Sequence, residues 1–295
     1  MAVLANRVTS VKKIVLWLGA IALFLVTFTV GDGQIRVAPR EGTTFELPEN
    51  ATWRVPSSPF RVGTYNIRRS KGLDDVRDIR RTAEVIGSES DIVGLQELSG
   101  SLFYGWHDQA HQLGHILGTG FLYAPTRWRW YQRYDGIGLL SRLPIKCWSI
   151  EGLPHRDVPK AYYRNLITAV VEIDGVEVTV LNTHLNRHET HSEQLEYIKG
   201  KFRAAATPAV LVGDLNNDLT DPVFQELLND EDVEDPLEKI IGDYWTLDWI
   251  LVRGLEVIDA GVVEPGVSDH PYVWAELSVP NAAKMTKRSS CPINL

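Results

Sequence analysis

The chain has 295 residues, 30 of them Lys or Arg and 38 of them Asp or Glu, which gives a formal net charge of −8. This length allows a substantial buried core in one large domain or two small ones, and no repeat or low-complexity segment is visible. The acidic balance argues against a general nucleic-acid coat, because non-specific binding depends on clustered Lys and Arg. It leaves a nuclease open, since a nuclease needs positive charge only at its site.

The first predicted element is an apolar segment close to the start of the chain. Residues 14–30 form an uncharged run of 17 residues, and Arg7, Lys12 and Lys13 precede it. As a helix the run spans roughly 25 Å, slightly less than the ~30 Å hydrocarbon core of a bilayer. We therefore expect residues 1–30 to be a cytoplasmic stub and membrane anchor, or a signal sequence, with the rest of the chain extracytoplasmic (periplasmic or extracellular). A single-pass anchor is favoured because the cleavage signature is weak; cleavage would give a secreted protein.

The part of the chain after this segment is more acidic than the whole. Removing residues 1–30 takes away three basic residues and no acidic residue, which leaves 27 basic against 38 acidic residues and a net charge of −11. Two cysteines, Cys147 and Cys291, could pair in an oxidising compartment. A core of this size does not need a cross-link, so we expect both cysteines to be structurally incidental.

Residues 31–59 are rich in Pro, Gly and charged residues, which predicts a linker or an extended lead-in. The globular domain is expected over residues 60–280 and a polar tail over residues 281–295. In chain order the predicted strands are 60–66, 91–95, 135–140, 145–150, 166–173, 176–182, 209–212, 247–252, 255–263 and 272–277, and the predicted helices are 74–88, 190–206 and 222–229. Hairpins combined with crossover helices predict a four-layer α/β sandwich of two packed mixed β-sheets flanked by helices.

Five stretches place polar side chains at or just beyond the end of an apolar strand. They are residues 62–66, 91–97, 182–186, 213–216 and 268–270. Together they supply carboxylates, amides and imidazoles, but no serine elbow or thiol nucleophile. This set points to a divalent metal that assists the attack of water on a phosphoester.

The first two stretches supply candidate metal ligands. Glu97 follows the apolar residues 92–95, and Asn66 ends the strand before it. Mg²⁺ takes a few oxygen ligands and keeps several waters, so one glutamate and one amide oxygen would suit it. Taken alone, Glu97 is equally typical of a solvated strand end, and Asn66 of a turn.

Asp214 and Asn216 are candidates for handling the attacking water. They are two positions apart, so in an extended segment both side chains face the same side. The carboxylate could orient or deprotonate a water molecule while the amide donates to a phosphoryl oxygen. A turn rich in Asn and Asp is the plain alternative for this pair.

Two histidines and one arginine complete the candidate set. His184 and His270 could each accept a proton when neutral or hold a phosphate oxygen when charged. Asp269 precedes His270 and would point to the opposite face of a strand, so Asp248 is the expected carboxylate partner of His270. Arg164 lies just before a predicted strand and could clamp a phosphate, or could be a solvated edge charge.

Residues 127–134 interleave three arginines with Trp128, Trp130, Tyr131 and Tyr134. Such a stretch could stack on nucleobases, lie in the headgroup layer of a membrane, or form a strand with one packed aromatic face.

The five stretches, together with residues 246–250, resemble the endonuclease/exonuclease/phosphatase superfamily in order and approximate spacing, over about residues 60–279. The resemblance implies a DNase I-like four-layer sandwich and hydrolysis without a covalent intermediate. It also implies Mg²⁺ or Mn²⁺ at Glu97 with Asn66 adjacent, while Asp269 would contribute to the metal site or hold its loop.

The same resemblance implies roles for the other motif residues. His270, partnered by Asp248, would be the base or the phosphate-polarising group. Asp214 and Asn216 would act on the attacking water and the phosphoryl oxygen, and His184 would bind phosphate. We also expect three further residues to bind the substrate phosphate: Arg164, Asn182 and Asn186.

From these observations we expect a membrane-anchored, Mg²⁺-dependent phosphoesterase that hydrolyses a phosphodiester or phosphomonoester by direct attack of activated water, and that acts as a monomer. The motifs do not choose among lipid, nucleic-acid and small-molecule substrates. One alternative is an extracytoplasmic endonuclease or exonuclease acting on DNA or RNA. A less favoured alternative is a catalytically inactive binding module of the same fold.

Overall fold

The computed structural model describes residues 12–24, 26, 35–36, 38–100, 107–129, 132–156, 162–188, 190–242 and 246–280. Residues 12–24 are helical, and their apolar side chains are exposed, Leu16 by 72% and Trp17 by 70%. Within the described ranges, no helix combines the length and the hydropathy needed to cross a membrane. The predicted polar tail, residues 281–295, lies outside the described residues.

The first of two sheets has seven strands in the order β1-β5-β6-β4-β3-β14-β13. Their bounds are β1 (Ile35–Arg36), β3 (Phe60–Asn66), β4 (Ile92–Gly100), β5 (Gly120–Arg129), β6 (Gln132–Ser141), β13 (Glu256–Val263) and β14 (Tyr272–Ser278). β3 and β4 run parallel and all other neighbours run antiparallel. The sheet is therefore mixed, and the parallel pair ends at one edge with Asn66 opposite Gln96.

The second sheet also has seven strands, in the order β11-β12-β10-β9-β8-β7-β2. Their bounds are β2 (Arg40–Gly42), β7 (Ile145–Gly152), β8 (Asn165–Ile173), β9 (Val176–His184), β10 (Ala209–Asp214), β11 (Val233–Glu234) and β12 (Asp248–Arg253). Here β9 and β10 form the parallel pair, which ends with His184 opposite Asp214. Each sheet thus carries one parallel pair, and Asn66, His184 and Asp214 lie at the ends of these strands. Glu97 lies inside β4, at a register shift between Leu95 and Leu98.

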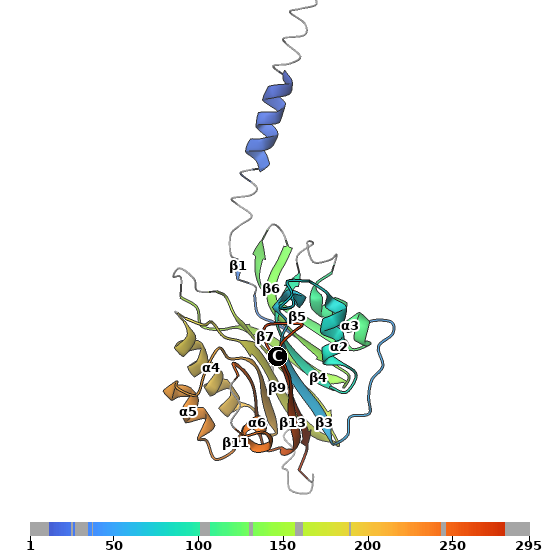
Figure 1. Ribbon diagram of the computed structural model, residues 1–295, viewed down its shortest axis with the longest axis vertical. Helices are drawn as coiled ribbons and strands as arrows, with labels where there is room; N and C mark the ends of the chain where they lie inside the picture. The colour runs from blue at the N-terminus through green and yellow to red at the C-terminus, as the bar shows by residue number, and fades with distance from the viewer. Residues whose placement is uncertain are drawn as a thin grey trace, which may run out of the picture.

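The described helices after β3 are η1 (Arg68–Ser70), α2 (Ile79–Ile86), α3 (Gln109–Leu117), α4 (His191–Ala204), α5 (Pro222–Leu228) and α6 (Pro236–Ile240). Four of them cover the outer faces of the sheets, whereas α6 contacts β12 and β13 and places Leu237 in the central cluster. Figure 1 shows α2 and α3 on the outer side of the first sheet and α4 and α5 on the outer side of the second. α2 connects β3 to β4 and α4 connects β9 to β10, which is the crossover that a parallel pair requires.

Apolar side chains pack in three clusters that hold the layers together. The central cluster lies between the sheets and includes Val62, Leu139, Val180 and Val212, each at most 1% exposed. The two outer clusters join the helices to the sheets, one with α4 and α5 and one with α2 and α3. Neighbouring residues of a strand serve different clusters because successive side chains point to opposite faces. The predicted four-layer α/β sandwich is confirmed.

The segment expected as a linker or an extended lead-in is built into the domain. β1 extends the first sheet and β2 the second. Phe45 is 6% exposed and belongs to the central cluster, and Trp148 Nε1 donates to the carbonyl of Thr44 at 2.8 Å. The described part of residues 31–59 is therefore an extended lead-in packed on both sheets. Its high content of Pro and Gly hid the two short strands.

Two local features were missed from sequence. The helix predicted over residues 74–88 begins only at Ile79, because the Asp78 side chain caps it by accepting from Arg80 N at 2.8 Å. α3 was not predicted, since Gly114 and two histidines interrupt its apolar pattern; the glycine is needed because Phe121 packs where a side chain would lie. Cys147 is buried in β7 and disulfide-bonded, so the expectation that it is incidental was wrong; Cys291 lies outside the described residues.

Candidate active site

Three neighbouring strands of the second sheet align an imidazole with two carboxylates. His184 at the end of β9 pairs with Asp214 at the end of β10, and Asp214 pairs with Asp248 at the start of β12. Directly opposed residues of neighbouring strands present their side chains on the same face, with Cβ atoms about 4.5–5.5 Å apart. All three residues are at most 2% exposed. The register of the sheet therefore assembles a buried row of titratable groups.

Asn66 links this row to the first sheet. Its Nδ2 donates to Asp214 Oδ2 at 2.9 Å and lies 3.5 Å from His270 Nε2. The hydroxyl of Ser268 donates to the Asn66 carbonyl at 2.6 Å, which ties the loop before β14 to the end of β3. Sequence reasoning missed Ser268 as a positioning residue, although it lies in a motif that was singled out.

His270 and Asp248 form a hydrogen-bonded pair, as predicted from sequence. His270 Nδ1 lies 2.7 Å from Asp248 Oδ2, and the imidazole is 20% exposed while the carboxylate is 1% exposed. Burial alone would lower the pKa of His270, but the hydrogen bond to Asp248 and the charges of Asp248, Asp214 and Asp269 raise it to about 9. His270 is therefore an imidazolium near neutral pH, held with Nε2–H on the side of Asp214, 3.9 Å from Oδ2.

Asp214 lies at the centre of the cluster. Its Oδ2 is 3.3 Å from His184 Nε2 and 3.9 Å from His270 Nε2. Burial raises the pKa of Asp214 to about 7, and the charge of Asp248 adds to this effect, while His270 and the hydrogen bond from Asn66 oppose it. This carboxyl group can therefore exchange a proton near neutral pH, which is the property that a general base needs.

His184 is locked in one neutral form. Arg164 Nη1 lies 3.0 Å from His184 Nδ1, and a guanidinium can only donate, so Nδ1 accepts and the proton resides on Nε2 facing Asp214. Burial lowers the pKa of His184 well below its ordinary value, and the charges of Arg164 and His270 lower it further. Both ring nitrogens are thus engaged within the protein. This corrects the expectation of direct phosphate binding, because His184 orients Asp214 instead.

Arg164 is the basic residue closest to this row. Its Nε donates to Asn186 Oδ1 at 2.9 Å, and among the described residues no carboxylate forms an ion pair with it. Burial lowers the pKa of Arg164 and the charges of Asp214 and Glu97 raise it, but a guanidinium stays protonated in proteins. A half-buried cation held by neutral groups is a site for an anion such as a phosphoryl group.

Two asparagines expected to bind phosphate have other roles. Asn182 is fully buried between the sheets, where it accepts from Gln96 Nε2 at 2.8 Å and donates to the Gly138 carbonyl at 2.7 Å. Asn186 is 2% exposed; its Nδ2 donates to Tyr162 O and Thr190 Oγ1 while its Oδ1 holds Arg164. These contacts use the polar atoms of both amides, so the structure assigns Asn182 to inter-sheet packing and Asn186 to the orientation of Arg164.

Asn216 shapes the loop after β10. Its backbone N–H donates to Asp214 Oδ1 at 3.0 Å, and its side-chain Nδ2 donates to the Leu185 carbonyl at 2.9 Å. It adopts a left-handed conformation with φ 49°, which asparagine tolerates better than most residues. Asn216 thus holds Asp214 and joins the ends of β9 and β10.

The candidate metal ligands lie close to the same cluster. Glu97 is half-buried, and its charge acts on both Asp248 and Arg164. Asn66 Oδ1 accepts from Arg68 N at 3.1 Å and keeps a second lone pair. Asp269 Oδ2 instead forms an ion pair with Arg68 Nε at 3.3 Å.

The chemistry of this donor set fits a hard cation. Asp248 Oδ1 is buried and makes no hydrogen bond. Among the described residues, one group of three acidic or imidazole side chains has its ligand atoms within 4.8 Å of one another, and it consists of Asp214, Asp248 and His270. Carboxylate and amide oxygens are the ligands that Mg²⁺ and Mn²⁺ prefer. Glu97 and Asn66 would hold such an ion, while Asp269 is paired with Arg68.

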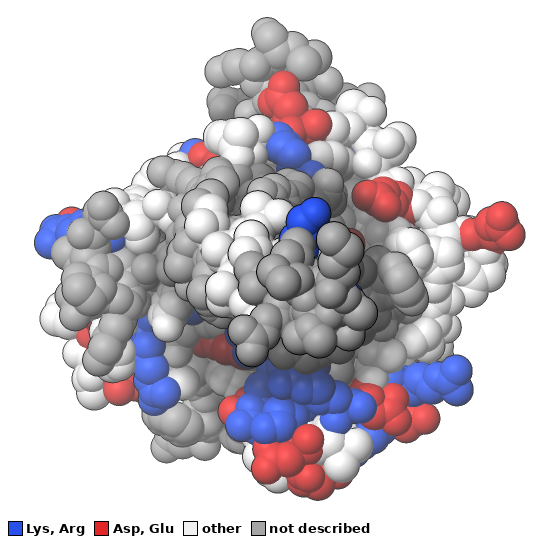
Figure 2. Space-filling model, turned by 90° about the horizontal axis from the view of Figure 1, so that it is seen from above, with Lys and Arg blue, Asp and Glu red and all other residues white. Residues whose placement is uncertain are grey.

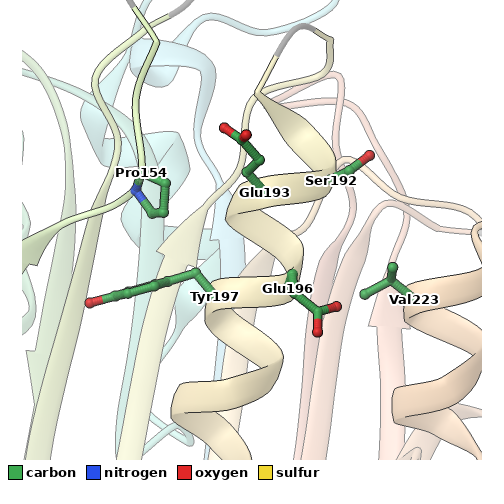
Figure 3. A pocket seen from close by; sticks show the side chains of 6 residues that line it. All are labelled: Pro154, Ser192, Glu193, Glu196, Tyr197 and Val223. Atoms are coloured by element: carbon green, nitrogen blue, oxygen red, sulfur yellow. The ribbon is translucent and has the colours of Figure 1, made fainter.

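A separate pocket of about 540 Å³ lies on the helical face of the second sheet, lined by Pro154, Ser192, Glu193, Glu196, Tyr197 and Val223. Figure 3 shows these side chains on α4, at the start of α5 and on the loop after β7. The pocket contains none of the predicted site residues.

Two packed mixed sheets, with carboxylate and imidazole side chains gathered at the ends of their parallel strands, are the arrangement of the DNase I-like class of phosphoesterases and nucleases. The model of the Endonuclease/Exonuclease/phosphatase family matches residues 63–270. The chain therefore belongs to this family, whose members are metal-dependent phosphoesterases and nucleases.

Solved structures share the fold at low sequence identity. An endonuclease/exonuclease/phosphatase from Beutenbergia cavernae has a TM-score of 0.62 and 24% identity, covering 76% of this chain and 72% of its own. The human Nocturnin catalytic domain with bound sulfate has a TM-score of 0.59 and 18% identity, covering 81% and 97%. D. rerio TDP2 with single-strand DNA product has a TM-score of 0.54 and 16% identity, covering 76% and 100%. No curated protein matches the sequence.

Proposed function

We propose that this protein is a Mg²⁺-dependent phosphoesterase that hydrolyses a phosphodiester or phosphomonoester by direct attack of water. The observation that carries the proposal is the position of Asp214. Its carboxylate is held by Asn66, His184 and the backbone of Asn216, and it faces His270 Nε2 at 3.9 Å. Asp214, with a pKa of about 7, and His270, with a pKa of about 9, thus lie next to each other and can serve as base and acid for the same substrate.

The proposed reaction assigns one task to each group. Arg164 binds a non-bridging phosphoryl oxygen, and Asp214 takes a proton from the water that attacks phosphorus. The new bond joins the water oxygen to phosphorus, and the bond to the leaving oxygen breaks. His270, kept protonated by Asp248, holds a phosphoryl oxygen or returns a proton to the leaving group. A divalent ion at Glu97 and Asn66 would neutralise charge that develops on the phosphoryl oxygens.

The proposal is tested with the full chain in detergent and a chromogenic diester, bis(4-nitrophenyl) phosphate. Hydrolysis should require Mg²⁺ or Mn²⁺, and Asp214→Ala and His270→Ala should each lower kcat by about 100-fold or more. A matched control is Asp218→Ala, a half-buried residue of the same loop whose carboxylate accepts from Thr220 N at 2.8 Å. Full activity of the double variant Asp214→Ala/His270→Ala would falsify the assignment.

We also propose that residues 1–30 anchor the protein in a membrane with the catalytic domain on the extracytoplasmic side. The uncharged run 14–30 and the basic residues before it support this orientation. The exposed apolar side chains of helix 12–24 need a covering partner. A disulfide at Cys147 is typical of an oxidising compartment. In sealed inside-out vesicles, whose cytoplasmic face is outward, the domain should be protected from added protease and should be digested after lysis. Digestion without lysis would contradict the proposed orientation.

Hydrolysis of DNA or RNA is the second candidate function. It is favoured by one observation from the sequence, the alternation of arginine and aromatic residues in 127–134, which is typical of single-strand binding. A short single-stranded oligonucleotide, offered with Mg²⁺ beside the diester, separates the two candidates. An inactive binding module is disfavoured because the described site retains Asn66, Glu97, Asp214 and His270. We propose a monomer.

A further inference from the structure

Three histidines form a row along α3. His107 precedes the helix, and His111 and His115 follow at intervals of four residues, which places their side chains one above the other. The rings of His107 and His111 stack with centroids 3.9 Å apart and planes inclined by 8°, and those of His111 and His115 stack with 4.2 Å and 26°. His107 and His115 are exposed and His111 is half-buried. Figure 1 shows α3 on the outer side of the first sheet, so this histidine row is open to solvent.

Phe121 of β5 lies beneath the histidine row. Its ring centroid is 5.1 Å from that of His111, in an edge-on arrangement with planes inclined by 69°, and 6.2 Å from that of His115. This packing explains how the two rings are held against the domain. It involves the faces and edges of the imidazoles, however, and gives no hydrogen-bond partner to their nitrogens.

The ring nitrogens of the row have no partner within the described part of the chain. His111 donates to Asp108 Oδ1 at 2.9 Å, but it does so from its backbone N–H, and this bond caps the helix. No described carboxylate forms an ion pair with His107, His111 or His115. Burial lowers the pKa of His111, and the charges of His107 and His115 lower it further. His111 is therefore neutral near neutral pH, which is the form of imidazole that binds a metal.

Charged side chains elsewhere on the domain are in many cases paired with one another. On the face that Figure 2 shows, Lys and Arg side chains lie beside Asp and Glu side chains. At the start of α2 and in the segment before it, Arg81 Nη1 lies 2.8 Å from Asp74 Oδ2, and Lys71 pairs with Asp75. Such carboxylates are already neutralised by a cation. The nitrogens of the histidine row face no such competition.

Two neighbouring imidazoles of the row can hold one metal ion. Zn²⁺ binds imidazole nitrogen at about 2.0–2.1 Å with tetrahedral geometry, so two such nitrogens on one ion lie ~3.3 Å apart. The ring spacings are close to this, and side-chain rotation of the exposed His107 or His115 can turn the lone pairs toward one ion. His107 and His115 are two ring spacings apart, so an ion uses His111 and one neighbour. Neutral His111 has one acceptor nitrogen and thus serves one ion at a time.

We infer that the histidine row is a second metal site, which binds a transition-metal ion such as Zn²⁺ through His111 and either His107 or His115. Imidazole suits Zn²⁺, Cu²⁺ and Ni²⁺, whereas Mg²⁺ prefers oxygen ligands, so the row and the candidate active site would take different metals. The cluster of Asp214, Asp248 and His270 includes none of these histidines. The inference goes beyond the proposed phosphoesterase function and does not depend on it.

The test measures Zn²⁺ binding by isothermal titration calorimetry on the full chain in detergent, without a polyhistidine tag and with Mg²⁺ in excess. The native chain should bind one more Zn²⁺ than His111→Gln, which lacks the histidine common to both pairs. Loss of an outer-shell partner alone lowers metal affinity by about 10–100-fold, so loss of this ligand should raise the Kd of the site by at least about tenfold. His188→Gln, at an exposed histidine outside the row, is the matched control and should bind as the native chain does.

Further variants test the arrangement of the row. His107→Gln and His115→Gln should each retain the site, because one neighbouring pair remains, whereas the double variant His107→Gln/His115→Gln should lose it. The double variant also supplies the test if His111→Gln fails to fold. Hydrogen exchange then locates the ion: Zn²⁺ should slow exchange of the α3 amides in the native chain and not in the double variant, because an ion between successive turns opposes opening of the helix.

Three results would overturn the inference. If the native chain binds no more Zn²⁺ than the double variant, the histidine row only packs on Phe121. If Zn²⁺ slows exchange in α3 equally in both proteins, the ion is bound by other groups. If both single variants lose the site, one ion would need all three imidazoles, which contradicts a site built from His111 and one neighbour.

Discussion

Arg164 donates from Nη1 to Nδ1 of His184 across 3.0 Å, and this bond decides which ring nitrogen of His184 carries the proton. Because Nδ1 accepts, Nε2–H faces Asp214 Oδ2 at 3.3 Å. Asn186 in turn holds Arg164 through Nε at 2.9 Å. The arginine therefore has two roles that can be separated: it offers charge to a phosphate, and through an imidazole it fixes the proposed general base.

The variant Arg164→Lys keeps the charge but cannot bond to Asn186 and His184 at once. We expect kcat/KM for a chromogenic diester to fall by about 100-fold, with part of the loss in kcat because Asp214 is no longer fixed. Arg156→Lys is the matched control, since Arg156 is 61% exposed and pairs with Glu193 at the surface. Equal activity of the two variants would show that the paired hydrogen bonds of Arg164 to Asn186 and His184 are not needed for catalysis.

Asp248→Asn should lower the pKa of His270. The present pKa of about 9 depends on the hydrogen bond and the charge of Asp248, which favour the imidazolium against the effect of burial. Without that charge, burial pulls the pKa toward or below its ordinary value of about 6.5. An NMR titration of the His270 ring in the metal-free protein measures the shift, and the alkaline limb of the kcat profile should move to lower pH. A ring pKa that stays near 9 would contradict this account.

The residues at strand ends could be predicted because their placement depends on local pattern. Asp214 and His184 follow apolar runs that form parallel neighbours, so their register brings them together once the strands are recognised. The pairing of His270 with Asp248 followed from the alternation of side chains along a strand. The same reasoning gave the two mixed sheets.

The uses of Asn182 and Asn186 could not be predicted because they depend on packing between distant segments. Asn182 lies in the same motif as His184, but an even spacing along β9 puts it on the face that meets Gln96 of the other sheet. Asn186 lies beyond the strand, where Tyr162 and Thr190 approach it from other parts of the chain. Motif membership therefore identifies the region of the site but not which amide is free.

The stability of the metal-free protein should depend on pH through Asp214. Its pKa is raised from an ordinary value of 3.8 to about 7, so the native state binds this proton more tightly than the unfolded state does. The resulting stability is fully present below about pH 4 and is lost as the pH rises through about 7. Asp214→Asn removes this dependence. Urea unfolding in the presence of EDTA should show the variant gaining stability relative to the native chain between pH 4 and pH 8. If the difference in free energy of unfolding between the variant and the native chain is the same at pH 4 and pH 8, the pKa of Asp214 is not raised.

Removing the divalent ion should stop hydrolysis reversibly. EDTA should abolish turnover and added Mg²⁺ or Mn²⁺ should restore it, since the half-buried Glu97 supplies the carboxylate that such an ion prefers. Glu97→Gln should raise the Mg²⁺ concentration for half-maximal activity by about tenfold or more. Glu89→Gln, on an exposed residue before β4, serves as the control. An unchanged Mg²⁺ requirement in Glu97→Gln would exclude this residue as a ligand.

Asn182→Ala distinguishes a packing role from phosphate binding. The substitution leaves the Gly138 carbonyl without its donor and removes an acceptor from Gln96 Nε2, both in the space between the sheets. Loss of a buried partner costs about 1–3 kcal/mol per unsatisfied group, so the melting temperature should fall by several degrees. KM for the diester, measured well below the transition, should change by less than about threefold, because no phosphate contact is lost. Asn229→Ala, at an exposed helix end, should change neither quantity appreciably. A large rise in KM at unchanged melting temperature would show that Asn182 binds the substrate phosphate. The interface between the sheets would then have to open at this position.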